Sequence, residues 1–213
     1  MPRRRRDADV ATRDRELLVV LEGGFDRAAR RAGDHLVCAP GCSDCCHGPF
    51  PITPLDVRRL REGLRQLEET DPPRAAALRC RAGAAVETLA DGFPGDPDSG
   101  RVRNDLDELD RFFERHRALA CPALDRSGRC ELYAHRPVGC RDYGPPLLYD
   151  GEPAPPCPLC FNDATSDEIE DCRYTPDPTG LEGEILAQLV EGPDDEWQTL
   201  IAFVLAGDDP RHL

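Results

Sequence analysis

Four cysteines and a histidine fall within residues 38–47 of this chain, in the segment CAPGCSDCCHGPF. Thiols at this density can form disulfides, ligate a metal ion or hold an iron–sulfur cluster, and each outcome constrains the surrounding fold differently. A chain of 213 residues can bury a hydrophobic core without covalent cross-links. The cysteines are therefore not needed for compactness, and their clustering indicates a chemical role.

The compartment decides which of these chemistries is available. The N-terminal segment MPRRRRDADVATRDRELL lacks the apolar run of a secretory signal, and no later stretch is long and apolar enough to span a membrane. We therefore expect a cytoplasmic protein that does not enter a membrane. In a reducing cytoplasm, clustered cysteines are more often metal ligands or redox groups than disulfides.

The charge balance argues against some partners and mechanisms. The net charge is −14, from 41 acidic and 27 basic residues, which disfavours binding to nucleic acid or to anionic lipid. Four consecutive arginines, 3–6, lie in a segment, 1–12, that we expect to be a disordered basic tail before one domain spanning 13–207. The chain has no lysine, which excludes Schiff-base and lysine-nucleophile mechanisms.

Apolar residues recur at helical spacing through most of the chain. Thr53 and Asp71 each precede a proline, which is typical of the first residues of a helix. We expect helices at 12–32, 54–69, 72–89, from 104 onward, and around 181–189 and 197–204. Two cysteine-rich segments, 38–51 and 121–160, lack this periodicity. The predicted fold is a mainly α, single helical domain in which these two irregular segments converge on a metal site.

The spacing in the first segment suits metal ligation. Gaps of two or three residues let Cys38, Cys42 and Cys45 point toward one ion. Cys46 differs, because adjacent side chains diverge; a vicinal pair indicates two centres, a cluster, or one cysteine that is not a ligand. His47 is a possible nitrogen donor, but we interpret it as a loop histidine, and we assign no role to Cys80 or Cys172.

The second segment, CPALDRSGRCELYAHRPVGCRDY, carries Cys121, Cys130 and Cys140 at wide spacing. They can share an ion only if the fold gathers them. Arg136 and Arg141 lie nearby, and their guanidinium groups can stabilise the negative charge of a thiolate site. Farther along, CPLC supplies Cys157 and Cys160 in a spacing typical of metal ligands and also of redox pairs.

These motifs resemble the YkgJ-like cysteine-cluster family, described as zinc- or iron-chelating proteins with a CxxCxxCC signature. The first gap is one residue longer here. The second segment follows the family pattern at Cys121, Leu124, Gly128, Cys130, Tyr133, Arg136, Pro137, Cys140, Arg141 and Tyr143. The resemblance implies metal chelation by the cysteines. Some relatives are considered protein lysine N-methylases, which would add S-adenosylmethionine and an iron–sulfur cluster.

A rival interpretation comes from the CxxxCxxC spacing of Cys38, Cys42 and Cys45, which radical S-adenosylmethionine enzymes use to hold a 4Fe–4S cluster. Asp44 stands where those enzymes have an aromatic residue, and the strand–helix repeats of their barrel are absent from the sequence. A cysteine nucleophile paired with His47 or His135 is disfavoured, because a metal-bound thiolate is a poor nucleophile.

The sequence therefore predicts a metal-binding protein that chelates zinc or iron, the iron being either an ion or a 4Fe–4S cluster. The alternative is an iron–sulfur enzyme that uses S-adenosylmethionine. Catalytic and cofactor-binding residues are not identified. The predicted metal ligands are nine thiols, enough for two four-ligand sites: Cys38, Cys42, Cys45, Cys46, Cys121, Cys130, Cys140, Cys157 and Cys160.

Overall fold

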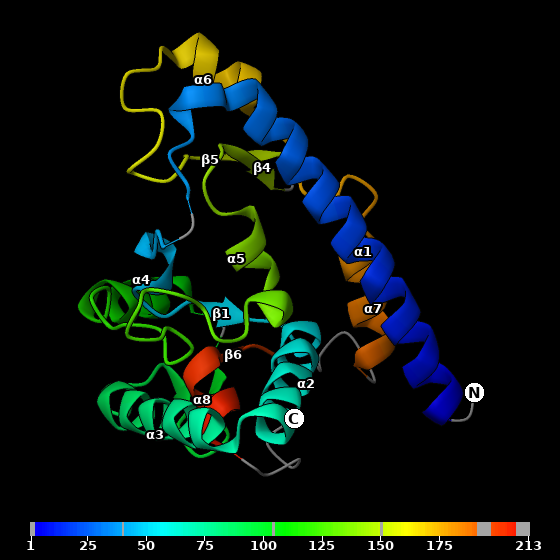
Figure 1. The fold of residues 1–213 in the computed structure, drawn as a ribbon, viewed down its shortest axis with the longest axis vertical. Coiled ribbons are helices and arrows are strands. Elements are labelled where there is room, and N and C mark those ends of the chain that lie inside the picture. Colours follow the sequence, from blue (N-terminus) through cyan, green and yellow to red (C-terminus); the bar gives the residue numbers. More distant parts are fainter. Residues whose placement is uncertain (1–2, 40, 104, 150, 191–196, 208–213) are drawn as a thin grey trace. The chain divides into compact units, whose positions relative to one another are not determined.

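The computed structural model describes residues 3–39, 41–103, 105–149, 151–190 and 197–207, and is mainly α (Figure 1). The chain forms two compact units. Unit 1 comprises Met1–Ala39 and Val138–Asp194, and unit 2 comprises Pro40–Pro137 and Asp195–Leu213. Each unit is thus built from two separate stretches of sequence.

Unit 1 is organised around a long helix, α1 (Arg3–Ala32). Three shorter helices pack on it: α5 (Val138–Asp142), α6 (Ser166–Cys172) and α7 (Leu181–Leu189), with α7 lying alongside α1 in Figure 1. The sequence predicted this helix only from residue 12, after a disordered tail, but residues 3–12 are helical and Val10 is buried. Val10 belongs to the apolar stripe of Leu17 and Leu21, so the stripe extends beyond the predicted start.

Unit 1 also contains a short antiparallel hairpin. Strand β4 (Leu147–Tyr149) pairs with β5 (Glu152–Ala154), and the guanidinium of Arg173 donates hydrogen bonds to the carbonyls of Leu147 and Ala154 at 2.8 and 2.9 Å. Together with α5, this hairpin gives regular structure to part of 121–160, a segment that we predicted to be irregular throughout. The short elements escaped prediction because Pro and Gly interrupt every apolar pattern there.

Unit 2 contains two helices whose first residues were predicted correctly. Helix α2 (Pro54–Thr70) begins with a capping box, in which the Thr53 hydroxyl accepts from the Asp56 amide and the Asp56 carboxylate accepts from the Thr53 amide. Helix α3 (Pro72–Leu89) follows directly, and the Asp71 carboxylate accepts from the Arg74 amide at 3.2 Å. Each proline takes a helical position that needs no hydrogen-bond donor.

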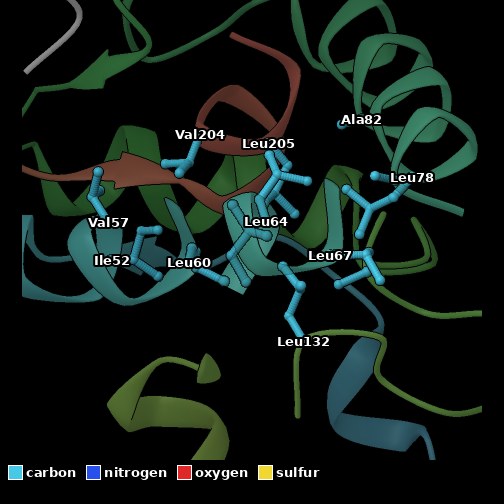
Figure 2. Close-up of a cluster of buried hydrophobic side chains, with 13 residues drawn as sticks. Ile52, Val57, Leu60, Leu64, Leu67, Leu78, Ala82, Leu132, Val204 and Leu205 are labelled. Carbon is cyan, nitrogen blue, oxygen red and sulfur yellow. The ribbon is translucent and has the colours of Figure 1, made fainter. Parts of the chain in front are cut away.

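The main core of unit 2 lies between α2, α3 and α8 (Ile201–Ala206). Figure 2 shows the leucines of α2 pointing toward Val204 and Leu205 of α8 and toward Leu78 of α3. Strand β6 (Thr199–Leu200) pairs antiparallel with β1 (Pro51–Ile52). The sequence predicted a single helical stripe over 197–204, so the strand at 199–200 corrects this prediction. The strand forms by pairing with residues 51–52, and such a distant partner leaves no pattern in the sequence around residue 199.

A second apolar cluster completes unit 2. The rings of Phe93 and Phe112 meet edge to face with centroids 5.8 Å apart, and Phe112 belongs to α4 (Leu106–Arg115). Two antiparallel strands of two residues each, β2 (Gly95–Asp96) and β3 (Arg101–Val102), precede this helix. The predicted helix start at 104 lies outside the described residues; Asp105 caps the helix observed.

No helix in the described part of the chain has the length and apolar character needed to cross a membrane.

Candidate metal centre

The cysteine loop of unit 2 is held by a tight turn. Residues Asp44–Cys46 form one 3₁₀ turn, in which the Cys46 amide donates to the Ser43 carbonyl at 2.9 Å and the His47 amide to the Asp44 carbonyl at 3.2 Å. The Nδ1 atom of His47 lies 2.9 Å from the same Ser43 carbonyl oxygen. The imidazole thus bonds within its own loop, as expected for a loop histidine.

Backbone hydrogen bonds join this loop to the start of the second cysteine segment. The Cys121 amide donates to the Cys46 carbonyl at 2.7 Å, and the Gly48 amide donates to the Leu119 carbonyl at 2.9 Å. His47 and Ala120 form an antiparallel bridge between these two bonds. The main chains of Cys46 and Cys121 therefore run side by side, although 119–121 follows much later in the sequence.

A second turn brings Cys130 back toward Cys121. The Asp125 carboxylate accepts hydrogen bonds from the amides of Ser127 and Arg129 at 2.8 and 2.9 Å, and Gly128 adopts a positive φ of 77° that favours glycine. Leu124 and Cys130 then form an antiparallel bridge. Four cysteines of unit 2 are gathered in this way: Cys45, Cys46, Cys121 and Cys130.

The thiols of this group influence one another's ionisation. The Cys46 thiol donates a hydrogen bond to the Cys45 sulfur, which lowers the pKa of Cys45 to about 7. The same bond raises the pKa of Cys46, and burial together with negative charge on Cys45, Cys121 and Cys130 raises it further. Burial also raises the pKa of Cys121 to about 11 and the pKa of Cys130. The four sulfurs are thus close enough to interact electrostatically.

Two arginines counteract part of the rise in thiol pKa that burial causes. The charge of Arg136 favours the thiolate forms of Cys45 and Cys130 and so offsets part of the rise in pKa that burial causes, and Arg81 acts in the same direction on Cys121. Arg136 is held over the Tyr133 ring, 3.9 Å from its centroid. Positive charge therefore lies where thiolates would form.

The segment that carries Cys121 and Cys130 is anchored on α3 by a residue that the sequence analysis missed. The Glu131 side chain is only 4% exposed and forms ion pairs with Arg74, whose Nε lies 2.6 Å from its oxygen, and with Arg81. The Arg81 guanidinium also donates to the Pro122 carbonyl at 2.9 Å. In the sequence, Glu131 is recognisable only as an acidic residue beside the predicted ligand Cys130. Its arginine partners are distant in the sequence and become apparent only in the fold.

The remaining predicted ligands are distributed differently. Cys42 belongs to unit 2 and is exposed. Unit 1 contains the other four: Cys38, Cys140, Cys157 and Cys160. Of these, Cys38 and Cys160 have sulfurs 4.0 Å apart. Cys80 is exposed on α3, whereas Cys172, to which the sequence analysis gave no role, is buried beside Cys157 and Cys160.

The donor set fits a soft metal ion. None of the eleven cysteines, all of which lie in the described part of the chain, forms a disulfide. Thiolates are the preferred ligands of zinc, copper(I) and iron–sulfur clusters. Within the described residues, however, no group of three or more Cys, His, Asp or Glu side chains is arranged closely enough to hold one metal ion. The convergence of both cysteine-rich segments on a common metal site therefore stays a prediction.

Comparison with known proteins identifies a single feature. A family model named CxxCxxCC and described as a putative zinc- or iron-chelating domain matches residues 37–158. Searches of curated proteins and of solved structures returned no match. The matched region contains both cysteine loops of unit 2 and the helices between them. It also contains residues of unit 1, among them Cys38, Cys140 and Cys157.

Proposed function

Since this chain belongs to the CxxCxxCC family of zinc- or iron-chelating domains, we propose that the thiols gathered in unit 2 bind one zinc or iron ion through Cys45, Cys46, Cys121 and Cys130. The observation that carries the proposal is the backbone pairing of the two loops, above all the 2.7 Å hydrogen bond from the Cys121 amide to the Cys46 carbonyl. This pairing brings together cysteines that lie far apart in the sequence of the family domain.

The vicinal pair is compatible with such a site. Adjacent cysteines diverge in an extended strand, but Cys45 and Cys46 lie in a 3₁₀ turn and their thiols are hydrogen bonded to each other. Both sulfurs therefore face a common space. A metal ion would displace the thiol protons of both residues, because thiol ligands bind in their deprotonated form.

Two arginines could offset the negative charge of a four-thiolate site at this position. Four thiolates around Zn²⁺ leave a net charge of −2, which is costly where the thiols are partly buried. Arg81 and Arg136 already favour the ionised thiols of this group. We expect them to stabilise the loaded site through charge-assisted hydrogen bonds.

Elemental analysis tests the proposal directly. Untagged protein purified without oxygen should contain zinc or iron, and its colour separates the alternatives, because an iron–sulfur cluster is brown whereas a zinc site is colourless. Protein that contains no transition element, or whose thiols are joined as disulfides, would overturn the proposal. The form of the iron, and the alternative of an enzyme that uses S-adenosylmethionine, stay predictions from the sequence.

Matched variants test the ligands. Cys45→Ser and Cys130→Ser should each lower the metal content and the melting temperature, because each removes one donor and leaves the remaining thiolates without their ion. Cys80→Ser is the control: Cys80 is exposed on α3, so this substitution should change neither quantity. Equal metal content in all three variants would remove the assignment of these ligands.

A further inference from the structure

We propose that Cys38 and Cys160 form an oxidation site, at which hydrogen peroxide converts two thiols into a reversible disulfide. Both cysteines belong to unit 1, whereas all the proposed metal ligands belong to unit 2. The reaction is therefore separate from the proposed function and needs no metal ion.

The distance between the two sulfurs carries the proposal. Cys38 Sγ lies 4.0 Å from Cys160 Sγ, although the residues are 122 positions apart in the sequence. A disulfide bond is about 2.05 Å long, so the two thiols are in contact but not bonded. Cys38 is exposed, which leaves its side chain room to rotate. We therefore expect the bond to form by side-chain rotation, without rearrangement of the main chain.

The two thiols differ in exposure as a peroxide-reactive pair requires. Cys38 lies at the surface, where peroxide can reach its sulfur, whereas Cys160 is only 4% exposed. Oxidation-sensitive cysteines are accessible to solvent and often lie next to a second cysteine that reacts with the first oxidation product. We assign the attack on peroxide to Cys38 and the second step to Cys160.

The reaction takes two steps. Cys38 Sγ attacks one oxygen of hydrogen peroxide, the O–O bond breaks, and the thiol proton leaves with the departing oxygen as water, which produces a sulfenic acid on Cys38. Cys160 Sγ then attacks the sulfenic sulfur. The S–S bond forms, the S–O bond breaks, and the hydroxyl leaves as water with the Cys160 thiol proton. The two thiols are oxidised by two electrons, and peroxide is reduced to water.

The main chain after Cys160 is fixed against the segment that leads into Cys38. Phe161 has a φ of 58°, in the left-handed region that is costly for a bulky side chain and persists only where the surrounding structure imposes it. Its amide donates to the His35 carbonyl at 2.8 Å, and its ring stacks on the His35 imidazole with centroids 5.7 Å apart. These contacts maintain the proximity of the two thiols.

A glycine borders the Cys38 sulfur on another side. A Cβ atom at Gly144 would lie 3.2 Å from Cys38 Sγ, and the glycine has a φ of 134°. The Gly144 carbonyl accepts from the Cys157 amide at 2.9 Å, and the Cys157 carbonyl accepts from the Cys160 amide at 2.8 Å. Backbone hydrogen bonds therefore connect the glycine beside Cys38 to the turn that carries Cys160.

The nearest rival pairing in the sequence is the CxxC pair of Cys157 and Cys160. Cys157 is as buried as Cys160, at 4% exposure, so neither member of that pair is accessible to peroxide. Cys38 supplies the accessible thiol that this pair lacks. The structure thus favours the pairing across the sequence over the pairing within the motif.

The position of the link gives it a consequence for stability. Unit 1 consists of two stretches, Met1–Ala39 and Val138–Asp194, and the disulfide would join one to the other. A cross-link that closes a long loop stabilises a fold by restricting the unfolded chain. Oxidation should therefore raise the melting temperature of unit 1, and reduction should reverse the change.

The experiment treats the reduced full chain with an equimolar amount of hydrogen peroxide and then blocks the remaining thiols with N-ethylmaleimide. Digestion without reductant and fragment-ion mass spectrometry identify the linked cysteines. We expect a link between Cys38 and Cys160 that dithiothreitol removes. Cys38→Ser, at an exposed position, should abolish this link. Cys172→Ser is the matched control, because Cys172 is buried in the same cluster as Cys160, and it should leave the yield of the link unchanged.

Three results would overturn the proposal. Recovery of Cys38 as a sulfinic acid, with Cys160 blocked by N-ethylmaleimide, would show that Cys160 does not react with the oxidised sulfur. A link between Cys157 and Cys160 in place of the expected one would show that the motif pairs internally. A disulfide-linked dimer on non-reducing electrophoresis would show that the exposed thiol reacts with another molecule.

Oxidation in guanidinium chloride separates the effect of the fold from the reactivity of the thiols. The unfolded chain can pair its eleven cysteines in many ways, so the share of the link between Cys38 and Cys160 should fall several-fold relative to the folded protein. An equal share under both conditions would show that the 4.0 Å proximity does not direct the bond. This comparison uses the wild type alone, so it does not depend on how a variant folds.

Discussion

The main-chain amide of Cys121 donates to the carbonyl oxygen of Cys46 at 2.7 Å, so two cysteines from different loops are joined by backbone rather than by side chain. The relative position of these loops is consequently set before any ligand binds. Side-chain substitutions at Cys46 or Cys121 leave this hydrogen bond intact, which makes cysteine variants in unit 2 suitable for separating metal binding from folding.

The effect of Cys46 on the ionisation of Cys45 should be visible in thiol reactivity. Because the hydrogen bond from Cys46 lowers the pKa of Cys45 to about 7, Cys45 is ionised above that pH and protonated below it. In metal-free protein we expect alkylation of Cys45 to rise with a midpoint near pH 7. Cys46→Ala removes the donor and should move this midpoint upward, toward about 8.5 or beyond. Fragment-ion mass spectrometry resolves the two adjacent sites, and a midpoint that does not move in Cys46→Ala would contradict the hydrogen-bond explanation.

The buried carboxylate next to Cys130 should contribute to both stability and metal affinity. Glu131→Gln keeps the shape of the side chain but removes the charge that pairs with Arg74 and Arg81. We expect a loss of about 1–3 kcal/mol in the free energy of unfolding, because hydrogen bonds to a charged group are replaced by weaker ones. Zinc affinity should fall as well. Glu62→Gln, which disrupts an exposed ion pair with Arg65, should cost under about 1 kcal/mol and leave affinity unchanged.

Two helical glycines should respond to alanine in opposite directions. A Cβ atom at Gly63 would lie 2.7 Å from Cγ of His135, so Gly63→Ala must displace the imidazole and should destabilise unit 2. Gly83, in α3, has no neighbour within 4 Å of the same atom, so Gly83→Ala should stabilise by up to about 1 kcal/mol through helix propensity. Thermal unfolding of the two variants measures the contrast; stabilisation by both would show that His135 moves without cost.

The two carboxylates at the starts of α2 and α3 should differ in their effect on stability. Asp56 and Arg59 form an ion pair at 2.8 Å in which the residues are only 3% and 5% exposed, and Asp56 also completes the capping box. Asp56→Ala should therefore cost about 3–5 kcal/mol, since Arg59 would keep a buried charge without this partner. Asp71→Ala removes only an exposed cap and should cost about 1 kcal/mol. Denaturant unfolding distinguishes the two, and equal losses would refute the role given to burial.

Local signals in the sequence predicted much of the fold. Thr53 with Pro54, and Asp71 with Pro72, identified the starts of α2 and α3, because a cap and its proline act within one helical turn. The α2 stripe of Val57, Leu60, Leu64 and Leu67 is buried as its spacing predicted. These features depend on neighbours a few residues away, which are visible in a single sequence.

Features that depend on distant partners were not predictable in this way. Strand β6 exists only because Thr199 and Leu200 pair with β1, and the helical interpretation of 197–204 failed there. The assignment of Cys38 and Cys42 to different units is equally invisible, since they are close neighbours in the motif. Cys172 appeared isolated because its neighbours in space, Cys157 and Cys160, belong to another segment.

The pairing of β1 with β6 affects the order of events during translation. Helix α8 and β6 complete the packing of α2, α3 and β1 in unit 2, yet they are synthesised long after Cys45 and Cys46. A nascent chain consequently exposes its sulfur-rich loop to solvent and oxidants for most of its synthesis. We expect stable metal insertion into this loop to be a post-translational event, which follows the synthesis of the residues near 200.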